Sequence, residues 1–201
     1  MALPEYQTIS KSMVFEETEK RSKFISYAFS VDSEDEVRQN LKDIKAKHWD
    51  ARHWVYAYRL AENNIEKYSD DGEPSGTAGL PVMNAIKSFG LQNILIIVVR
   101  YFGGVLLGSS GLRKMYGSGA AGGLKKSEIK TCVLCKHIII HTEYKEYDKV
   151  SYILSKIGAL VENAEYQDKI KLDVFVKKED LDLILQNCLN YKLLEDRYKC
   201  I

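Results

Sequence analysis

A glycine-rich stretch at residues 100–120 combines backbone freedom with positive charge. It reads RYFGGVLLGSSGLRKMYGSGA, holds three cationic side chains and no carboxylate, and directly follows the aliphatic run at 94–99. Free N–H groups where a loop opens a helix bind anions. Arginine side chains make charge-assisted hydrogen bonds to phosphate oxygens. These residue types therefore indicate a phosphate or nucleic-acid site.

We expect this site to combine a strand end, a glycine turn and the start of a helix. The strand should end at Tyr101, Ser109 or Ser110 should cap the helix, and Tyr101 and Phe102 offer rings on which bases can stack. The residues assigned to the site are Arg100, Tyr101, Gly103, Gly104, Gly108, Ser109, Ser110, Arg113 and Lys114. In the structural alternative, the glycines serve only the turn and the aromatic rings belong to the core.

Two nucleotide-binding motifs are nearly matched in this region. Gly103 and Gly108 have the spacing of a Walker A loop, but Ser109 replaces the lysine that holds the β- and γ-phosphates. Residues 117–122 fit G-x-G-x-x-G, yet they fall inside an expected helix rather than after a strand. We therefore predict neither nucleotide hydrolysis nor a dinucleotide site.

A second candidate is acidic. The segment DDGEPSGTAG, residues 70–79, brings Asp70, Asp71 and Glu73 together, and a predicted strand places His53 nearby. Clustered carboxylates can bind a divalent cation or shift each other's pKa for acid–base chemistry. No known metal-ligand spacing is matched, so we predict no metal and no cofactor. A solvated turn is the alternative, because Asp-Gly and Pro-Ser-Gly are common turn sequences.

The cysteines are unevenly placed. Cys132 and Cys135 form a C-x-x-C, which with His137 and His141 could be half of a zinc site, or could be a redox pair. The intervals do not fit a zinc finger, and in a strand the two cysteines would point to opposite faces. Four cysteines in this arrangement fit a reducing compartment better than a disulfide framework. We expect ordinary buried cysteines.

Charge and hydropathy narrow the functional classes. The formal net charge of the 201 residues is +1, so any nucleic-acid site must be local rather than a property of the whole molecule. The N-terminus lacks the apolar region of a secretory signal. No aliphatic run approaches the roughly 20 residues that span a bilayer. We therefore predict a cytoplasmic protein without membrane association.

Periodicity predicts the elements that position these residues. In the first part of the chain we expect a hairpin at 12–31, a helix at 33–48 with Ser33 as N-cap and Glu36 completing a capping box, and a strand at 52–60. A short helix at 80–90, a strand apolar on both faces at 93–101 and a glycine-rich helix at 110–126 follow.

The last part reads strand, helix, strand, strand, helix, strand. The segments are 136–144, 145–159, 160–168, 169–178, 179–190 and 192–200, an order typical of ferredoxin-like domains. The predicted fold class is therefore α+β with two domains, residues 1–137 and residues 138–201.

Longer motifs resemble a known family. GLPVMNAIKSFGLQNILIIVVRYFGGVLLG, residues 79–108, is similar to the signature of the IMPACT/YigZ family, and RHWVYAYR and DDGEPSGTAG stand at that family's upstream spacing. The C-terminal part resembles the extra domain of bacterial YigZ-type members. The positions that match the motif are Asp71, Gly72, Glu73, Pro74, Gly76, Arg100, Gly103, Gly104 and Gly108.

The resemblance implies a fold more strongly than a function. It implies an N-terminal domain like the second domain of a small-subunit ribosomal protein, and a C-terminal domain like the last domain of elongation factor G. The eukaryotic member regulates translation by binding a kinase activator through an additional N-terminal domain, so that role is not transferred. Ribosome or nucleic-acid binding by bacterial members is inferred from fold.

Three functions are consistent with these residues. The leading hypothesis is a non-enzymatic protein that binds nucleic acid or the ribosome and is linked to the regulation of translation. The alternative is an enzyme for a small phosphorylated or acidic substrate, with Asp71 and Glu73 facing the glycine loop. The third is a protein-interaction module. The expected partners are RNA or the ribosome, with a protein partner also open, and the sequence leaves the oligomeric state open.

Overall fold

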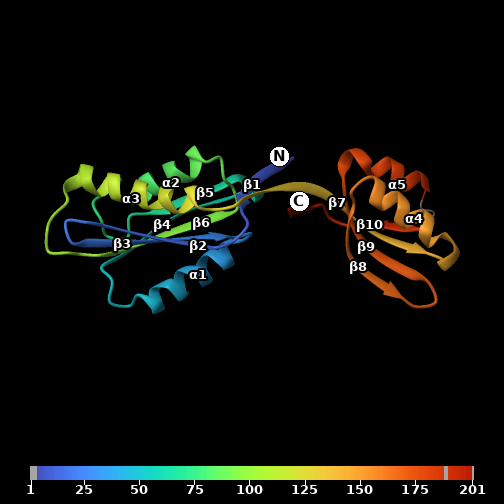
Figure 1. Ribbon diagram of the computed structural model, residues 1–201, viewed down its shortest axis with the longest axis horizontal. Coiled ribbons are helices and arrows are strands. Elements are labelled where there is room, and N and C mark those ends of the chain that lie inside the picture. The colour runs from blue at the N-terminus through green and yellow to red at the C-terminus, as the bar shows by residue number, and fades with distance from the viewer. Residues whose placement is uncertain (1–3, 188–189, 201) are drawn as a thin grey trace. The chain divides into compact units, whose positions relative to one another are not determined.

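The chain folds into two compact units of mixed α+β structure. The computed structural model describes residues 4–187 and 190–200, and the division falls between residues 131 and 132 (Figure 1). This point lies inside strand β7 (Ile129–Thr142). The boundary placed at 137/138 from the sequence falls further along the same strand. No helix among the described residues is both long and apolar enough to cross a membrane.

The N-terminal unit is built on a five-stranded antiparallel sheet. Its strands are β2 (Met13–Glu19), β3 (Ser22–Ser30), β6 (Ile94–Tyr101), β4 (His53–Leu60) and β5 (Ile65–Ser69), in that spatial order. Helices α2 (Gly79–Ser88) and α3 (Gly108–Lys125) cover one face, and α1 (Glu34–Lys47) covers the other (Figure 1). The expected hairpin, helices and strands in this unit are confirmed.

Strand β6 is central because its side chains supply two cores. Ile94, Ile96 and Val98 pack with residues of α2 and α3. The alternate residues Leu95, Ile97 and Val99 pack with residues of α1. All six are buried, which confirms that this strand is apolar on both faces.

Helix α1 begins where its capping residues predict. Ser33 Oγ accepts a hydrogen bond from the Glu36 backbone N–H at 3.3 Å. The Glu36 carboxylate accepts from the backbone N–H of Asp32 rather than that of Ser33. The cap is therefore confirmed at Ser33, and the reciprocal bond of the capping box lies one residue earlier than expected.

The glycines within α3 let this helix approach the sheet closely. A Cβ added at Gly119 would lie 2.8 Å from Ser26 Oγ, and one at Gly122 would lie 2.5 Å from the Phe15 ring. Any larger side chain at these positions would therefore push the helix away from β2 and β3. Gly119 and Gly122 of the G-x-G-x-x-G match at residues 117–122 therefore serve to pack α3 against the sheet.

The sequence patterns missed two short strands. Strand β1 (Glu5–Ile9) pairs with β7, and β5 forms an edge of the N-terminal sheet. The sequence of β5, IEKYS, carries three exposed side chains in a row. An edge strand facing solvent needs no alternation of apolar residues, so periodicity gives no signal there.

The C-terminal unit follows the predicted order of strands and helices. Its elements are β7, α4 (Tyr144–Lys156), β8 (Leu160–Tyr166), β9 (Ile170–Lys177), α5 (Leu181–Asn187), β10 (Tyr191–Leu193) and β11 (Arg197–Cys200). The last predicted strand is divided into β10 and β11, and both pair with β7. Residues 188–189 of the last predicted helix lie outside the described residues.

One disulfide joins the two ends of the C-terminal unit. Cys132 on β7 is bonded to Cys200 on β11, directly opposite in the strand pair. Cys135 is a free, buried thiol, and burial raises its pKa. The expectation that Cys132 is an ordinary unpaired cysteine is wrong, because folding brings together two residues that lie 68 positions apart.

Candidate functional site

The acidic and glycine segments meet at one pocket of the N-terminal unit. We call residues 70–78 the acidic loop and residues 102–107 the glycine loop. The pocket has a volume of about 880 Å³. It is lined by Asp50, Ala51, Arg52, His53, Glu73, Pro74, Arg100, Tyr101, Phe102, Leu106, Leu107, Gly108, Ser109 and Leu112. This volume suits a ligand of nucleotide size.

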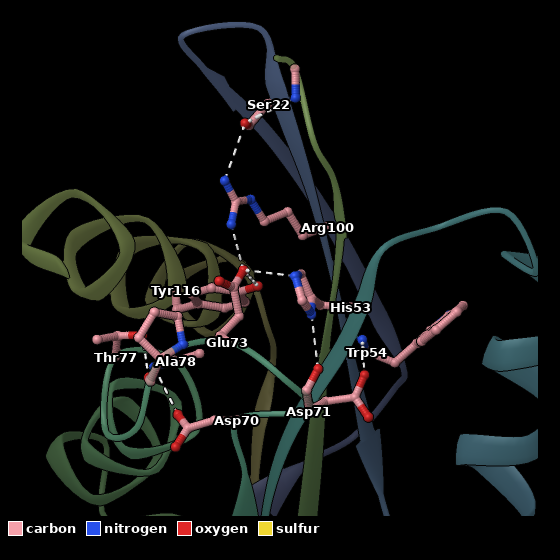
Figure 2. A network of polar contacts seen from close by, with 12 residues as sticks. Ser22, His53, Trp54, Asp70, Asp71, Glu73, Thr77, Ala78, Arg100 and Tyr116 are labelled. Atoms are coloured by element: carbon pink, nitrogen blue, oxygen red, sulfur yellow. Dashed lines mark hydrogen bonds and ion pairs between the residues drawn. The ribbon is translucent and has the colours of Figure 1, made fainter. Parts of the chain in front are cut away.

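Glu73 is the centre of the polar contacts at the pocket floor. Its Oε1 atom accepts hydrogen bonds from Arg100 Nη1 at 2.5 Å and from the Tyr116 hydroxyl at 2.8 Å. His53 Nε2 lies 3.7 Å from the same oxygen, as Figure 2 shows. Burial, followed by the charge of Glu73, raises the pKa of Tyr116. Tyr116 therefore stays protonated and donates.

Arg100 is a buried member of this group rather than an exposed cation. It is 5% exposed, and its guanidinium lies 5.5 Å from the ring centroids of both Phe24 and Phe102. Its Nη2 reaches Ser22 Oγ at 3.5 Å, and its buried Nε has no hydrogen-bond partner among the described residues. The sequence assigned Arg100 to gripping phosphate, but the structure shows its charge already compensated by Glu73.

The orientation of His53 is fixed by the acidic loop. Its Nδ1 lies 2.8 Å from the backbone carbonyl oxygen of Asp71. A carbonyl oxygen only accepts hydrogen bonds, so Nδ1 must carry a proton. The other ring nitrogen, Nε2, is thereby turned toward Glu73 (Figure 2).

The three carboxylates of the acidic loop do not form a cluster. The Asp70 carboxylate accepts hydrogen bonds from the backbone N–H groups of Gly76, Ala78 and Gly79, and so organises the start of α2. Asp71 accepts from the backbone N–H of Trp54 at 2.7 Å, away from Glu73 (Figure 2).

The prediction that Asp71 faces the glycine loop is therefore wrong, and of the three acidic-loop carboxylates only Glu73 lines the pocket. The cause is local backbone geometry: Asp71 and Gly72 both have positive φ, 44° and 84°, which turns neighbouring side chains apart. Within residues 4–187 and 190–200, no three His, Cys, Asp or Glu side chains gather as a metal site requires.

The glycine loop is anchored at Gly103, and Leu107 packs partly against the core, while the other residues of the loop are exposed. The Gly103 N–H donates to Ser22 Oγ, and a Cβ at Gly103 would lie 2.1 Å from the backbone of Arg21. Gly103 therefore serves a close backbone approach, as the structural alternative expected. Phe102 is 49% exposed and Leu106 82% exposed. At these positions the loop presents apolar side chains to solvent instead of burying them.

Helix α3 opens at the pocket without a side-chain cap. It begins at Gly108 after Leu107, which has no side-chain oxygen, so the prediction that Ser109 or Ser110 is the N-cap is wrong. Both serines lie in the first turn, and Gly108 and Ser109 line the pocket. The first N–H groups of a helix carry partial positive charge and attract anions.

The remaining predicted site residues occupy the surroundings of the pocket. Arg113 is exposed, and its Nε donates to the Gly76 carbonyl at 3.3 Å, which ties α3 to the acidic loop. Lys114 is exposed on the same helix and does not line the pocket. Tyr101 donates to Asp50 and also contacts His48 Nδ1. Its ring packs against the core on the α1 side, so it acts as an anchor and not as a free stacking face.

Three residues at or beside the pocket escaped the sequence analysis because they come from separate elements. Asp50 lines the pocket and lies between α1 and β4. Tyr116 of α3 and Ser22 at the start of β3 contact Glu73 and Arg100 without lining the pocket. Trp49, which precedes Asp50, is 80% exposed. No motif spacing links these positions. The exposed Trp49 side chain is the chemically distinctive feature near these residues, and its exposure is known only from the structure.

Comparison with known proteins places the chain in a family. The Impact N-terminal domain matches residues 20–124, and a domain of unknown function (DUF1949) matches residues 140–186. IMPACT family member YvyE of Bacillus subtilis is 31% identical over 179 residues, covering 89% of this chain and 82% of YvyE. IMPACT family member YigZ of Escherichia coli is 31% identical over 158 residues, covering 77% and 78% of the two chains.

A solved structure of the same kind covers both units. The crystal structure of a hypothetical protein matches with a TM-score of 0.67 at 26% identity, covering 96% of this chain and 97% of that one. The first matched domain contains both the acidic and the glycine loop. The chain belongs to the IMPACT family.

Proposed function

We propose that the N-terminal unit binds RNA, either free or as part of a ribosome, in the regulation of translation. The observation that carries this proposal is the edge of the pocket, where the uncapped start of α3 meets the exposed side chains of the glycine loop. The first turn of α3 offers N–H groups to a phosphate. The Phe102 ring offers a face for base stacking.

Exposed cations surround this edge and replace Arg100 as candidate phosphate contacts. Arg52 lines the pocket, and Arg113 and Lys114 lie on α3. Lys20 and Arg21 form the turn that touches Gly103. All five are exposed. Long exposed cations contact phosphates without reading sequence, so binding should be weakly sequence-specific and sensitive to salt.

The two fold resemblances predicted from the sequence point in the same direction. A unit like a small-subunit ribosomal protein domain and a unit like the last domain of elongation factor G would both belong to the translation apparatus. These finer resemblances stay predictions. They support the choice of ribosomal RNA as a ligand by analogy of fold alone.

The test is fluorescence anisotropy with labelled single-stranded RNA at two salt concentrations. The native protein should bind more weakly as salt rises, because each neutralised phosphate releases counterions. The double variant Arg52→Ala/Arg113→Ala should bind more weakly, with the slope of log affinity against log salt reduced by about 2.

A matched control removes two exposed lysines from the C-terminal unit. Lys149→Ala/Lys156→Ala makes the same change in charge on α4 and should leave affinity and slope unchanged. Binding that does not respond to salt, or that responds equally to both double variants, would contradict a phosphate site at this pocket.

A second candidate function is an enzyme for a small phosphorylated or acidic substrate. It is favoured by the group of Glu73, Arg100, Tyr116 and His53, which holds a carboxylate and an imidazole 3.7 Å apart at a pocket floor. Such a pair suits acid–base chemistry. Isothermal titration with inorganic phosphate, adenosine monophosphate and citrate tests it. Binding of one of these without binding of RNA would favour this candidate.

A further inference from the structure

The pocket floor offers hydrogen-bond acceptors that lack donors. Glu73 makes all its contacts through Oε1: with Arg100, with Tyr116 and, at 3.7 Å, with His53. No described residue bonds its second carboxylate oxygen, Oε2. Glu73 lines the pocket, so a ligand that enters can supply the missing donor.

His53 adds a second acceptor at the same place. Its Nδ1 proton is committed to the Asp71 carbonyl oxygen, so in the neutral ring the lone pair is on Nε2. Nε2 lies too far from Glu73 Oε1, at 3.7 Å, to form a hydrogen bond with it. The acidic loop therefore holds the imidazole with its accepting nitrogen directed at the pocket floor.

The two open acceptors, Glu73 Oε2 and His53 Nε2, belong to neighbouring side chains and suit a hydroxyl donor. A hydroxyl group carries one proton, so it can donate to either of these acceptors at about 2.8 Å. A divalent cation is a poorer fit, because Asp71, the next carboxylate, is bonded to Trp54 and faces away. The floor thus favours a neutral donor.

We propose that Glu73 and His53 recognise the ribose 2′-hydroxyl of a nucleotide seated in the pocket, so that the protein prefers RNA to DNA. The proposal rests on the proposed function and deepens it. Acceptors lie at the floor, while the donors of the α3 start and the exposed Phe102 ring lie at the edge. A nucleotide presents hydroxyl donors, a phosphate and an aromatic base. The 2′-hydroxyl is the group that distinguishes RNA from DNA.

The test compares RNA, DNA and 2′-O-methyl RNA of one sequence, with uracil in all three, by fluorescence anisotropy at fixed salt. The native protein should bind RNA about tenfold more tightly than DNA, as one hydrogen bond to a buried polar group allows. The 2′-O-methyl strand cannot donate, and it should bind no better than DNA.

His53→Asn is the informative variant. The asparagine amide can still donate to the Asp71 carbonyl oxygen, but the shorter side chain has no atom at the Nε2 position. This variant should bind DNA as the native protein does, and its RNA affinity should fall to the same level. His141→Asn makes the same substitution in the C-terminal unit, outside this pocket, and should keep the preference. Circular dichroism and urea midpoints establish that both variants fold.

The possible outcomes separate the two proposals. Equal affinity of the native protein for RNA and DNA would overturn the 2′-hydroxyl site and leave RNA binding standing. A preference that persists in His53→Asn would also overturn it. Failure to bind any of the three strands would overturn the proposed function and this inference together.

Discussion

The two loops that form the pocket are held in opposite ways. The acidic loop is fixed from within, because the Asp70 carboxylate accepts three backbone N–H groups and Glu73 is buried among Arg100 and Tyr116. The glycine loop is fixed at Gly103 and exposes apolar side chains, with Leu106 82% exposed. One loop is therefore part of the packed fold and the other is available for contact.

This difference assigns separate tasks to the two sides of the pocket. A floor whose polar atoms are already fixed can recognise a small group without rearranging. An exposed loop with few hydrogen bonds can adapt to a larger surface at little cost in stability. Substitutions in the acidic loop should therefore affect folding first, and substitutions in the glycine loop should affect binding first.

The largest effect is expected where the floor is most buried. Glu73→Gln keeps the size of the side chain but removes the charge that compensates Arg100, whose side chain is 6% exposed. Breaking one partner of a buried ion pair costs about 3–5 kcal/mol. Urea unfolding of the N-terminal unit should show a loss of this size.

A surface ion pair supplies the control for Glu73. Glu16→Gln breaks the pair with Lys23, whose side chains are 51% and 43% exposed. Exposed pairs contribute at most about 1 kcal/mol. Comparable losses in the two variants would mean that Glu73 and Arg100 are solvated in solution, and would remove the contrast between the loops.

The second prediction compares two adjacent glycines. A Cβ at Gly103 would lie 2.1 Å from the backbone of Arg21, so Gly103→Ala must displace the turn and should cost about 2–3 kcal/mol. Gly104 has open space around it and a φ of +81°. Gly104→Ala should cost only the conformational strain, about 1 kcal/mol. Urea midpoints rank the two variants, and the reverse order would place the anchor of the glycine loop elsewhere.

The sequence predicted most of the strands and helices that carry the two loops but not the contacts between their side chains. The continuous apolar run at residues 94–99 and the Ser33 cap depend on near neighbours, and both predictions were confirmed. The direction of Asp71 depends on two successive positive φ angles, and composition does not encode these. Glu73 is surrounded by residues from β4, β6 and α3. Only tertiary packing brings these strands and this helix to one point, so no spacing along the sequence marks the site.

The third prediction concerns pH at the strand end that leads into the glycine loop. Tyr101 is held there by His48, which also contacts the Tyr27 hydroxyl. Burial, followed by the charge of Lys47, lowers the pKa of His48 from its ordinary 6.5. At pH values between the lowered pKa of His48 in the folded protein and the ordinary 6.5 of the unfolded chain, the unfolded chain binds more protons than the folded one. The free energy of unfolding therefore falls as the pH drops.

The stabilisation by neutral His48 should be complete above about pH 7 and decrease through pH 6.5 toward the lower folded pKa. Urea midpoints at pH 7.5 and pH 5.8 should therefore differ by less than about 1 kcal/mol in stability, with the lower value at pH 5.8. His48→Phe should be less stable at both pH values but should lose most of this dependence. An unchanged slope in that variant would assign the proton to another group.

The smallest effect on stability is expected at the most exposed residue of the glycine loop. Leu106→Ser removes an apolar side chain that is 82% exposed, so urea unfolding should change by less than about 0.5 kcal/mol. RNA affinity should still fall about fivefold, because about 1 kcal/mol of apolar contact with the ligand is lost. A variant that loses stability without losing affinity would show that the glycine loop, like the acidic loop, belongs to the packed fold. Loss of affinity without loss of stability would mean that Leu106 contributes only when a ligand covers it.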